Sequence, residues 1–431
     1  MLKKAFKVRL YPNKTQALYI AKAIGCVRAI YNMMLHDEKE AYQAYVDAEK
    51  DMTDEEKKAH KYTHKINYSI YGKQEQASYL KEIEARALNY VQQNLNTAFQ
   101  NFFKNRNKGF GFPTFKKKMT AGSFQSDKIQ VVGRKLKIPK CPGLVPFRNY
   151  ENIDFSTLTT KTITISRTSN YKYYASILCD VPDEEPLPKT GKTIGIDLGV
   201  TSAVTLDDGR KIDRKSILTK KKFFRGNRNG EDPRVKELRS QIEFYQAKMM
   251  KAGVWQDVTF TGKDGNTHTK RKLVQETGNY RRLKEKVAAL TEKLNNIRQD
   301  YINKVAKTLV EEADVICMED LTIRTDGNSR GMLADNENLT NRQNQTKHRN
   351  IAEASMGMIG TKVESMAARY GRTVVKVNPA NTTRTCHCCG YVMTEGLATS
   401  IREWTCPQCH AHHDRDVNAA KNILARGVAK L

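Results

Sequence analysis

Three acidic residues stand where apolar segments end or where a helix begins. Asp197 closes the strand-like segment TIGID, Glu319 closes DVICME, and Asp416 precedes the helix-like segment VNAAKNILA. Neighbouring strand ends in one sheet bring their side chains together, and like charges so placed need a cation. Carboxylate oxygens suit Mg²⁺ or Mn²⁺, and two such ions stabilise the attacking and leaving oxygens of an in-line phosphodiester displacement. We therefore predict a catalytic site in which these three residues ligate two divalent ions.

Each acid also has a simpler interpretation. Asp197 comes shortly before Gly199, and aspartate near glycine is common in turns. Asp416, taken alone, is more often a helix N-cap than a metal ligand. Asp320 and Asp414 are the nearest competitors for the ligand roles. Because Asp320 directly follows the second acid in the chain, its side chain is expected to point elsewhere.

Four cysteines form the most specific local pattern. Cys386 and Cys389 make one C-x2-C pair, Cys406 and Cys409 make another, and sixteen residues separate the pairs. This spacing is typical of a tetrahedral zinc ribbon, and a four-cysteine set leaves no open position, so one structural Zn²⁺ is predicted. Cys388 is an odd thiol inside the first pair. The imidazoles nearby are interpreted as solvated or facing phosphate, with a ligand role as the alternative; they belong to His387, His410, His412 and His413.

The composition indicates a polyanionic partner. The chain has 74 Lys and Arg against 47 Asp and Glu, a formal net charge of +27 and a pI near 9.6, which is more than solubility requires. Between Arg210 and Arg228 lie nine basic residues and one acid, with Phe223 and Phe224 among them. Phosphates with stacked bases are the natural counterpart of that mixture, so Arg225 and Arg228 are predicted to contact nucleic acid. A basic enzyme without such a partner is the alternative.

The sequence carries no pattern that favours export or membrane insertion. No run approaches the roughly eighteen apolar residues of a membrane span, and the basic start MLKKAFKVRLYP has no apolar signal-peptide segment behind it. Cys26, Cys141, Cys179 and Cys317 are isolated from one another. This usage is typical of a reducing compartment rather than a disulfide framework. We expect a cytoplasmic protein that does not associate with a membrane.

The first half of the chain reads as helices combined with an antiparallel sheet. KKAFKVRLYP alternates basic and apolar residues, which predicts a strand. Apolar residues three and four apart predict helices over about Ala17–Met34 and Glu82–Lys104. From Ile129 to Val181 the apolar period is two, which predicts a small antiparallel sheet or barrel.

A basic loop precedes that sheet. In GFGFPTFKKK, the glycines and Pro113 exclude a helix, and three lysines follow an aromatic run. Lys116, Lys117 and Lys118 are predicted to contact nucleic acid, and a plain solvated turn is the alternative.

The second half begins after a linker and reads as an α/β domain. Pro182–Lys192 is a linker by composition. The segments TIGIDLG and SAVTL then predict two strands, and DVICMED and TVVKV predict two more. Helices are predicted from about Pro233 and from about Tyr280, with a polar insertion over Val254–His268 between them. Strands that alternate with helices are typical of an α/β fold.

These motifs resemble those of the TnpB family, transposon-encoded RNA-guided nucleases from which the compact type V CRISPR effectors descend. GIDLGVTSAVTL with Asp197, ICMEDL with Glu319, and the cysteine pairs followed by DRDVNAAKNI with Asp416 are similar to the three motifs of a RuvC-type, RNase H-like nuclease, in the family's order. KVRLYPNKTQ and GCVRAIYN, with AFQNFFK and PTFKKK further on, resemble the family's first half. The resemblance covers nearly the whole chain and is most specific in the second half.

The resemblance implies a fold class and a set of domains. The implied fold is multidomain α+β, with a RuvC-type RNase H-like α/β nuclease domain that carries a zinc ribbon insert, an N-terminal helical recognition module and a wedge-like antiparallel β-barrel. The implied ranges are 1–12 with 110–185 for the barrel, 13–109 for the recognition domain, 192–380 with 411–431 for the nuclease domain, and 381–410 for the ribbon, which in the family binds the target nucleic acid.

The resemblance also implies a function, RNA-guided hydrolysis of DNA. The implied partners are a guide RNA, a double-stranded DNA target with a short motif beside it, and single-stranded DNA at the nuclease site. Gln92 and Gln93 on the second helix are candidates for reading that motif. No C-x2-C pair lies near the N-terminus, which argues against the dimeric miniature effectors and favours a monomer. The Val254–His268 insertion looks longer than is common in the family.

Two other functions compete with guided cleavage. A guide-RNA-directed DNA-binding repressor or transposon regulator would bind without cutting, but such relatives usually lose one of the three acids, and all three are present here. A guide-free nuclease or transposase is the other alternative. Cut-and-paste transposases tend to end their triad in Glu, whereas this chain has Asp416, and a guide-free enzyme has little use for so large a basic N-terminal half. The RNA-guided DNA endonuclease is therefore the first hypothesis.

Overall fold

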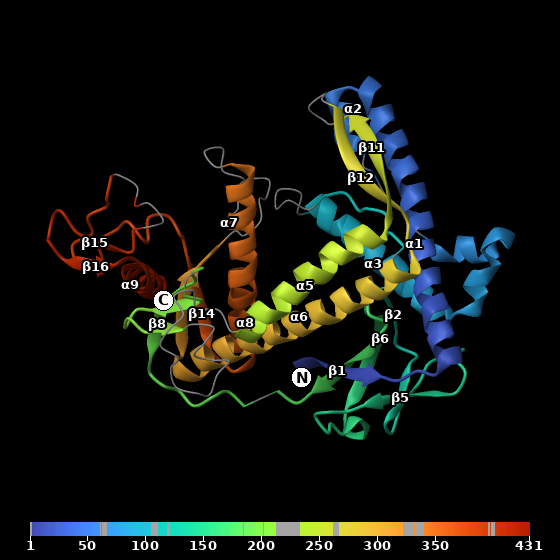
Figure 1. The fold of residues 1–431 in the computed structure, drawn as a ribbon, viewed down its shortest axis with the longest axis horizontal. Coiled ribbons are helices and arrows are strands. Elements are labelled where there is room, and N and C mark those ends of the chain that lie inside the picture. Colours follow the sequence, from blue (N-terminus) through green and yellow to red (C-terminus); the bar gives the residue numbers. More distant parts are fainter. Residues whose placement is uncertain are drawn as a thin grey trace. The chain divides into compact units, whose positions relative to one another are not determined.

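The chain folds as two compact units (Figure 1), Met1–Asp183 and Glu184–Leu431. The computed structural model describes residues 2–431 apart from 61, 63–66, 105–110, 119–120, 184, 201, 213–232, 262–266, 322–331, 333–339, 395–396 and 398–400. The boundary between the units falls inside the stretch that composition marks as a linker. The finer domain ranges stay predictions.

The first unit is organised around a seven-stranded antiparallel sheet. Its order is β2-β6-β7-β1-β5-β4-β3, so the first strand of the chain becomes the middle of the sheet. Alternate residues of that strand, Phe6, Val8 and Leu10, are buried. The strands are β1 Leu2–Leu10, β2 Gly122–Ser126, β3 Gln130–Val132, β4 Lys135–Lys137, β5 Leu144–Arg148, β6 Thr159–Arg167 and β7 Tyr173–Val181.

The barrel expected here is an open sheet in the described residues. The described residues show no pairing between β2 and β3, which are the two edge strands of the sheet. A helix packs on the face of the sheet at β2, because Gly122 lies against Ile24 so closely that a Cβ at 122 would collide with the Ile24 side chain.

The helices of the first unit pack on this sheet in one core. The long helix α1 starts with a capping box, in which Asn13 accepts from the Gln16 amide and the Gln16 side chain accepts from the Asn13 amide. One 18-residue window of α1 has a mean hydropathy of 1.2, and 56% of that window is buried in the fold, with Ile20 and Leu35 fully covered. This apolar stretch is therefore a core stripe of the unit. The helices are α1 Lys14–Ala48, α2 Asp54–Ala59 and α3 Ala85–Lys104, with 3-10 turns at Glu49–Asp51, Tyr68–Lys73, Glu75–Glu82 and Phe155–Thr157.

The second unit contains a five-stranded mixed sheet. Its order is β10-β9-β8-β13-β14, in which β8, β13 and β14 are parallel, β9 is antiparallel to β8, and β10 is antiparallel to β9. The strands are β8 Thr193–Asp197, β9 Val204–Leu206, β10 Lys211–Ile212, β13 Val315–Glu319 and β14 Thr373–Val377. The helices are α5 Pro233–Ala252, α6 Gly278–Glu312, α7 Asn341–Ala354, α8 Met356–Arg369 and α9 Arg415–Val428.

Two hairpins lie outside that sheet. β15 Glu403–Thr405 pairs with β16 His412–Asp414 just ahead of α9. β11 Val254–Thr261 pairs with β12 Thr267–Gln275 between α5 and α6. The polar insertion expected over 254–268 is therefore a strand pair, consistent with its content of Thr, Val, Trp and Phe.

Helix α9 packs unusually closely on the sheet. A Cβ at Gly195 of β8 would collide with the Ala420 carbonyl oxygen and would lie 2.7 Å from Leu424 Cβ. Gly427, near the other end of the helix, approaches Cys317 of β13 with the same tightness. Glycine is the residue that allows one backbone to approach another so closely. Small residues in the strand and the helix thus fix the height of α9 above the sheet.

Gly195→Ala should therefore lift or tilt α9 and destabilise the second unit by about 1–3 kcal/mol, the usual cost of overpacking. The measurement is the melting temperature of the full chain. Gly278→Ala is the matched control, because nothing lies within 4 Å of a Cβ at that helix start. Equal melting of the Gly195→Ala variant and the wild type would show that the contact is loose.

Candidate active site and cysteine cluster

The first two acids lie side by side at the ends of adjacent parallel strands. Met318 pairs with Ile196 in the β13–β8 register, so the next step brings Glu319 beside Asp197. Side chains alternate along a strand, and Asp197 therefore shares its face with Gly195, the face that α9 covers. Both carboxylates are half-buried.

The third acid comes from the start of the helix that covers this face. Asp416 lies in the first turn of α9. Its neighbour Asp414 is the N-cap, with its carboxylate accepting from the amides of Asp416 and Val417, each at 3.0 Å, and bonding Lys211 Nζ at 2.7 Å. Because Asp414 satisfies the helix end, the Asp416 carboxylate is left available to the site.

Asp197 is the electrostatic centre of the group. Burial raises the pKa of its carboxyl from the ordinary 3.8 to about 8, and the charges of Glu319 and Asp416 also raise it. The guanidinium groups of Arg415 and Arg402 act in the opposite direction. Arg402 Nη1 lies 3.5 Å from Asp416. The chain thus supplies part of the positive charge that these acids need, but not all of it.

Glu319 is held by a residue that sequence patterns do not single out. The buried Thr382 hydroxyl donates to Glu319 Oε1 at 2.5 Å. Asn422 of α9 in turn donates to the Thr382 carbonyl at 2.8 Å. Burial raises the pKa of Glu319, and the Thr382 hydrogen bond opposes that rise. The only sequence signal for Asn422 is its spacing of four from Asn418 on the buried face of a short helix.

The three carboxylates do not form a single tight cluster, because their oxygens do not all lie within 4.8 Å of one another. Asp320, the nearest competitor, is 67% exposed and pairs with Lys376 at 3.4 Å. Asp320 is therefore turned away from the group, as its place in the strand predicted.

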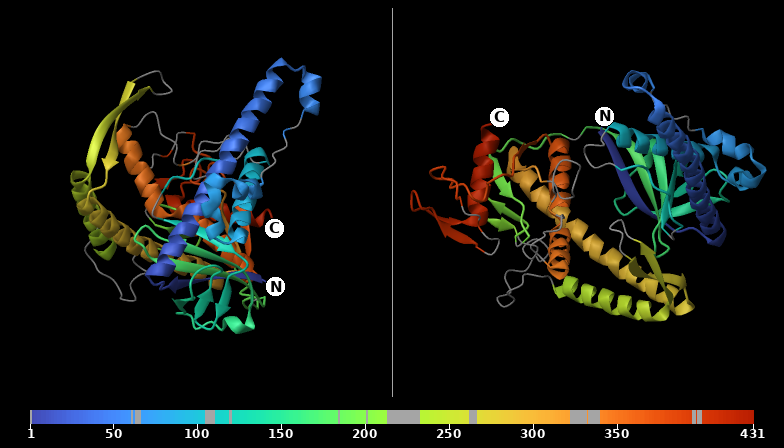
Figure 2. Two further views of the ribbon diagram at one scale, coloured as in Figure 1. Left: turned by 90° about the vertical axis from the view of Figure 1, so that its right-hand side faces the viewer. Right: turned by 90° about the horizontal axis from the view of Figure 1, so that it is seen from above.

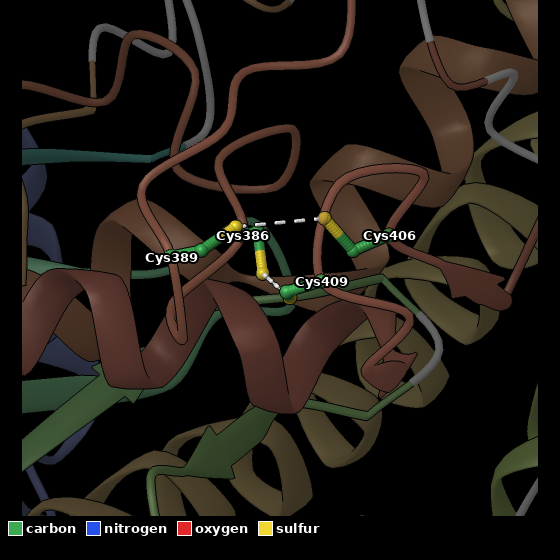
Figure 3. Close-up of side chains that lie close together, drawn as sticks. All are labelled: Cys386, Cys389, Cys406 and Cys409. Carbon is green, nitrogen blue, oxygen red and sulfur yellow. Dashed lines mark hydrogen bonds between the residues drawn. The ribbon is translucent and has the colours of Figure 1, made fainter.

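Four cysteine sulfurs converge near the start of α9 (Figure 3). Those of Cys386 and Cys409 are 3.6 Å apart, as are those of Cys389 and Cys406. A tetrahedral Zn–S₄ centre with bonds of about 2.3 Å has S–S separations close to this. The four sulfurs therefore suit a structural metal such as zinc.

The two cysteine turns have the same backbone construction. Gly390 donates to the Cys386 carbonyl and His410 donates to the Cys406 carbonyl, each at 2.9 Å. Both donors have a positive φ, 80° for Gly390 and 57° for His410. Each C-x2-C pair is thus closed by a left-handed residue, which turns both sulfurs of the pair inward.

His413 does not lie in solvent or on an open surface, contrary to the interpretation from sequence. It is 3% exposed, and its Nε2 lies 3.1 Å from Cys386 Sγ. Its ring packs on Trp404, with the centroids 4.7 Å apart. The reason is the β15–β16 register, which sets His413 opposite Trp404 and so turns it into the small core of the cluster. His387 Nδ1 also has a partner, Asn418 Oδ1 at 3.0 Å.

Comparisons with known proteins match both ends and the full length of the chain. A family model described as "Cas12f1-like, TNB domain" matches residues 357–423, and one described as "Helix-turn-helix domain" matches residues 1–46. The structure has β1 and all but the last two residues of α1 in the latter range. A putative RNA-guided DNA endonuclease of Streptomyces pristinaespiralis is 29% identical over 99% of this chain and 90% of its own length. The putative RNA-guided DNA endonuclease InsQ of Escherichia coli is 24% identical over 99% of this chain and 93% of its own length.

These relatives and family models support a TnpB-family protein. The resemblance drawn from the sequence motifs is confirmed. The solved structure of a Cas12f1–sgRNA–target DNA complex agrees in fold, with a TM-score of 0.51, 13% identity and 98% of each chain covered.

The lysines predicted to contact nucleic acid differ in the contacts that they make within the fold. Lys116, Lys117 and Lys118 are all exposed. Lys116 is also fastened to α1, with its amide donating to Asn32 Oδ1 at 2.8 Å and its ammonium 3.9 Å from the centre of the Tyr31 ring. Desolvation there lowers the Lys116 pKa. Lys116 thus has a structural role in anchoring the loop, whatever it contacts besides.

The other residues predicted to contact nucleic acid also differ in their contacts within the fold. Gln92 accepts from the Tyr68 amide at 3.1 Å, so it supports the neighbouring turn. Gln93 is exposed on α3. Arg225 and Arg228 lie outside the described residues.

Asp197→Asn should raise the melting temperature in magnesium-free buffer, because it removes a buried charge that the fold disfavours. A carboxyl with a raised folded-state pKa costs stability above its unfolded pKa of about 3.9, so the gain should grow between pH 5 and pH 8. In a unit of this size each kcal/mol corresponds to about 2–4 °C. Asp320→Asn, the exposed neighbour, is the control without a gain. Lower melting of Asp197→Asn at pH 8 would contradict this electrostatic account. Chelators should be avoided, since they would also strip the cysteine cluster.

Cys406→Ser should remove the bound metal and lower the stability of the chain together, because metal binding and local folding are coupled. The measurement is zinc per chain by elemental analysis, with thermal melting alongside. Cys388→Ser, in the other cysteine turn and outside the four-cysteine set, is the control and should keep one zinc. Retention of zinc by Cys406→Ser would exclude the four-cysteine set, and loss of zinc from Cys388→Ser would favour the alternative set of Cys386, Cys388 and His413, whose ligand atoms also lie within 4.8 Å of one another.

Proposed function

We propose that this chain is an RNA-guided DNA endonuclease with its catalytic site at Asp197, Glu319 and Asp416. One observation carries the proposal: two acids end adjacent parallel strands, and the helix packed over their face begins with the third. The second unit, with its mixed five-stranded sheet and packed helices, supports the RNase H-like, RuvC-type nuclease domain that the sequence motifs imply. The full-length relatives named RNA-guided DNA endonucleases support the same assignment.

Divalent cations fit the site on chemical grounds. Three hard oxygen donors meet where burial and like charge disfavour ionisation of Asp197, and a cation relieves that cost. Asp197, Glu319 and Asp416 would together hold the ions. Bound Mg²⁺ or Mn²⁺ would supply an activated water and stabilisation of the leaving oxygen of a phosphodiester.

The chain's own groups would orient and shield these ligands. The Thr382 hydroxyl fixes one Glu319 oxygen, which leaves the other oxygen available to hold a cation. Arg402, beside Asp416, would contact the scissile strand's phosphates, since a guanidinium matches phosphate geometry. Asn418 and Asn422 both donate to the Thr385 carbonyl, at 2.8 and 2.6 Å, and so tie the lead-in of the cysteine cluster to the catalytic helix.

The proposed partners follow from this reading. A guide RNA would select a double-stranded DNA target beside a short motif, and one unpaired DNA strand would enter the acidic site. One zinc ion would stabilise the cysteine cluster, and the working form would be a monomer in the cytoplasm. The alternative of a DNA-binding repressor predicts the same RNA and target binding without cleavage. The three acids in one place favour the nuclease.

Asp197→Ala, Glu319→Ala and Asp416→Ala should each abolish cleavage while leaving target binding near normal. The assay uses the chain expressed with its genomic flanks, the RNA that co-purifies with it, and a plasmid library with Mg²⁺. Asp320→Ala is the matched control, an adjacent acid outside the site. A triad variant that still cuts would refute the catalytic assignment. Wild-type protein that binds RNA and target but never cuts would establish the repressor, and the absence of any specific RNA would point to a guide-free enzyme.

A further inference from the structure

The β11–β12 hairpin stands apart from the core of the second unit. Figures 1 and 2 show it extending from the region where α5 ends and α6 begins. Trp255 anchors its base, with Nε1 donating to the Met250 carbonyl at 2.8 Å and its ring packing on Tyr280. Beyond Trp255 all of β11 is exposed. A two-stranded hairpin of this kind is at best marginally stable alone, so a surface that covers it would add to its stability.

One face of the hairpin combines apolar and basic side chains. The register pairs Gln256 with Lys272 and Val258 with Lys270. Phe260 lies on the same face, two residues further along β11. Val258 is 39% exposed and Phe260 49% exposed. This face carries an aromatic ring beside a row of lysines.

A basic cavity lies at the base of the hairpin. It has a volume of about 420 Å³, and Lys248, Lys251 and Arg282 line it together with Tyr245 and Asn279. Nine Lys and Arg and three Asp and Glu are present among the described residues of 244–286. The cavity and the hairpin face, which are close in the chain, each offer cations suited to a phosphate backbone, and the hairpin face adds an aromatic ring suited to accessible bases.

We propose that this surface, the hairpin face and the basic cavity, binds the guide RNA outside its target-pairing segment. The inference rests on the proposed function. Protein interfaces are depleted in lysine, whereas lysines alternate here with the exposed apolar groups. A target DNA differs from one event to the next and is read by base pairing. The constant partner of the complex is the RNA, and RNA recognition uses unpaired bases stacked on aromatic side chains.

The test compares Lys270→Gln/Lys272→Gln with Lys304→Gln/Lys307→Gln, an equal charge change on α6 where each lysine pairs with an acid. The full-length protein is titrated with the in vitro transcript of its co-purified RNA at several salt concentrations. Losing two phosphate contacts should reduce the slope of log Kd against log salt by about 1.4, and the control should keep the wild-type slope. Phe260→Ala should weaken RNA binding by at least about fivefold without changing the slope, as loss of one stacked base would.

The outcomes separate this inference from the proposed function. Unchanged RNA affinity and slope in the hairpin variants, with guided cleavage intact, would overturn the inference alone. Normal RNA binding with weaker target binding by the preassembled complex would overturn it in favour of a DNA surface. A wild-type protein without a specific RNA would remove the proposed function and this inference together. Equal melting temperatures of all variants exclude misfolding as the cause.

Discussion

The close approach of α9 to the sheet is the constraint on which the candidate site depends. Gly195 and Gly427 remove the side chains that would otherwise separate helix from strand, and Ala419 and Ala420 add no bulk on the buried side of the helix. Because α9 packs so close to the sheet, its first turn lies level with the ends of the strands. The position of the Asp416 carboxylate relative to Asp197 is therefore set by backbone packing rather than by any bond between the acids, which repel each other.

That repulsion lowers the stability of the fold, and the proposed function would require the three acids nonetheless. Asp197 is forced toward the neutral state by burial and by two neighbouring acids, and its two opposing arginines offset only part of this. An apolar residue in place of Asp197 would stabilise the fold. The same holds for most buried charged residues that lack a full set of partners. The retention of three acids in one half-buried group argues for a cation-dependent role, because structure alone gives no reason for it.

Much of this arrangement follows from local sequence patterns, and the rest depends on contacts between distant segments. The strands that end in Asp197 and Glu319, and the C-x2-C pairs, are visible because strand period and ligand spacing are local properties. The identity of the α9 cap is different: Asp414 and Asp416 are equally plausible in sequence, and only the hydrogen bonds to the Asp416 and Val417 amides distinguish them. The sequence gives no signal for Thr382 either, because its partner Glu319 lies 63 positions away.

The cysteine cluster also explains why a structural metal site precedes the third acid so closely. The segment that leads into the cluster carries Thr382, which binds Glu319, and the segment between the cysteine pairs carries Arg402, which lies beside Asp416. Closing the four sulfurs around one ion would therefore fix two groups that flank the acids, one on each side. The cluster is thus part of the framework of the acidic site, and its proximity to Asp416 is a geometric requirement of that role.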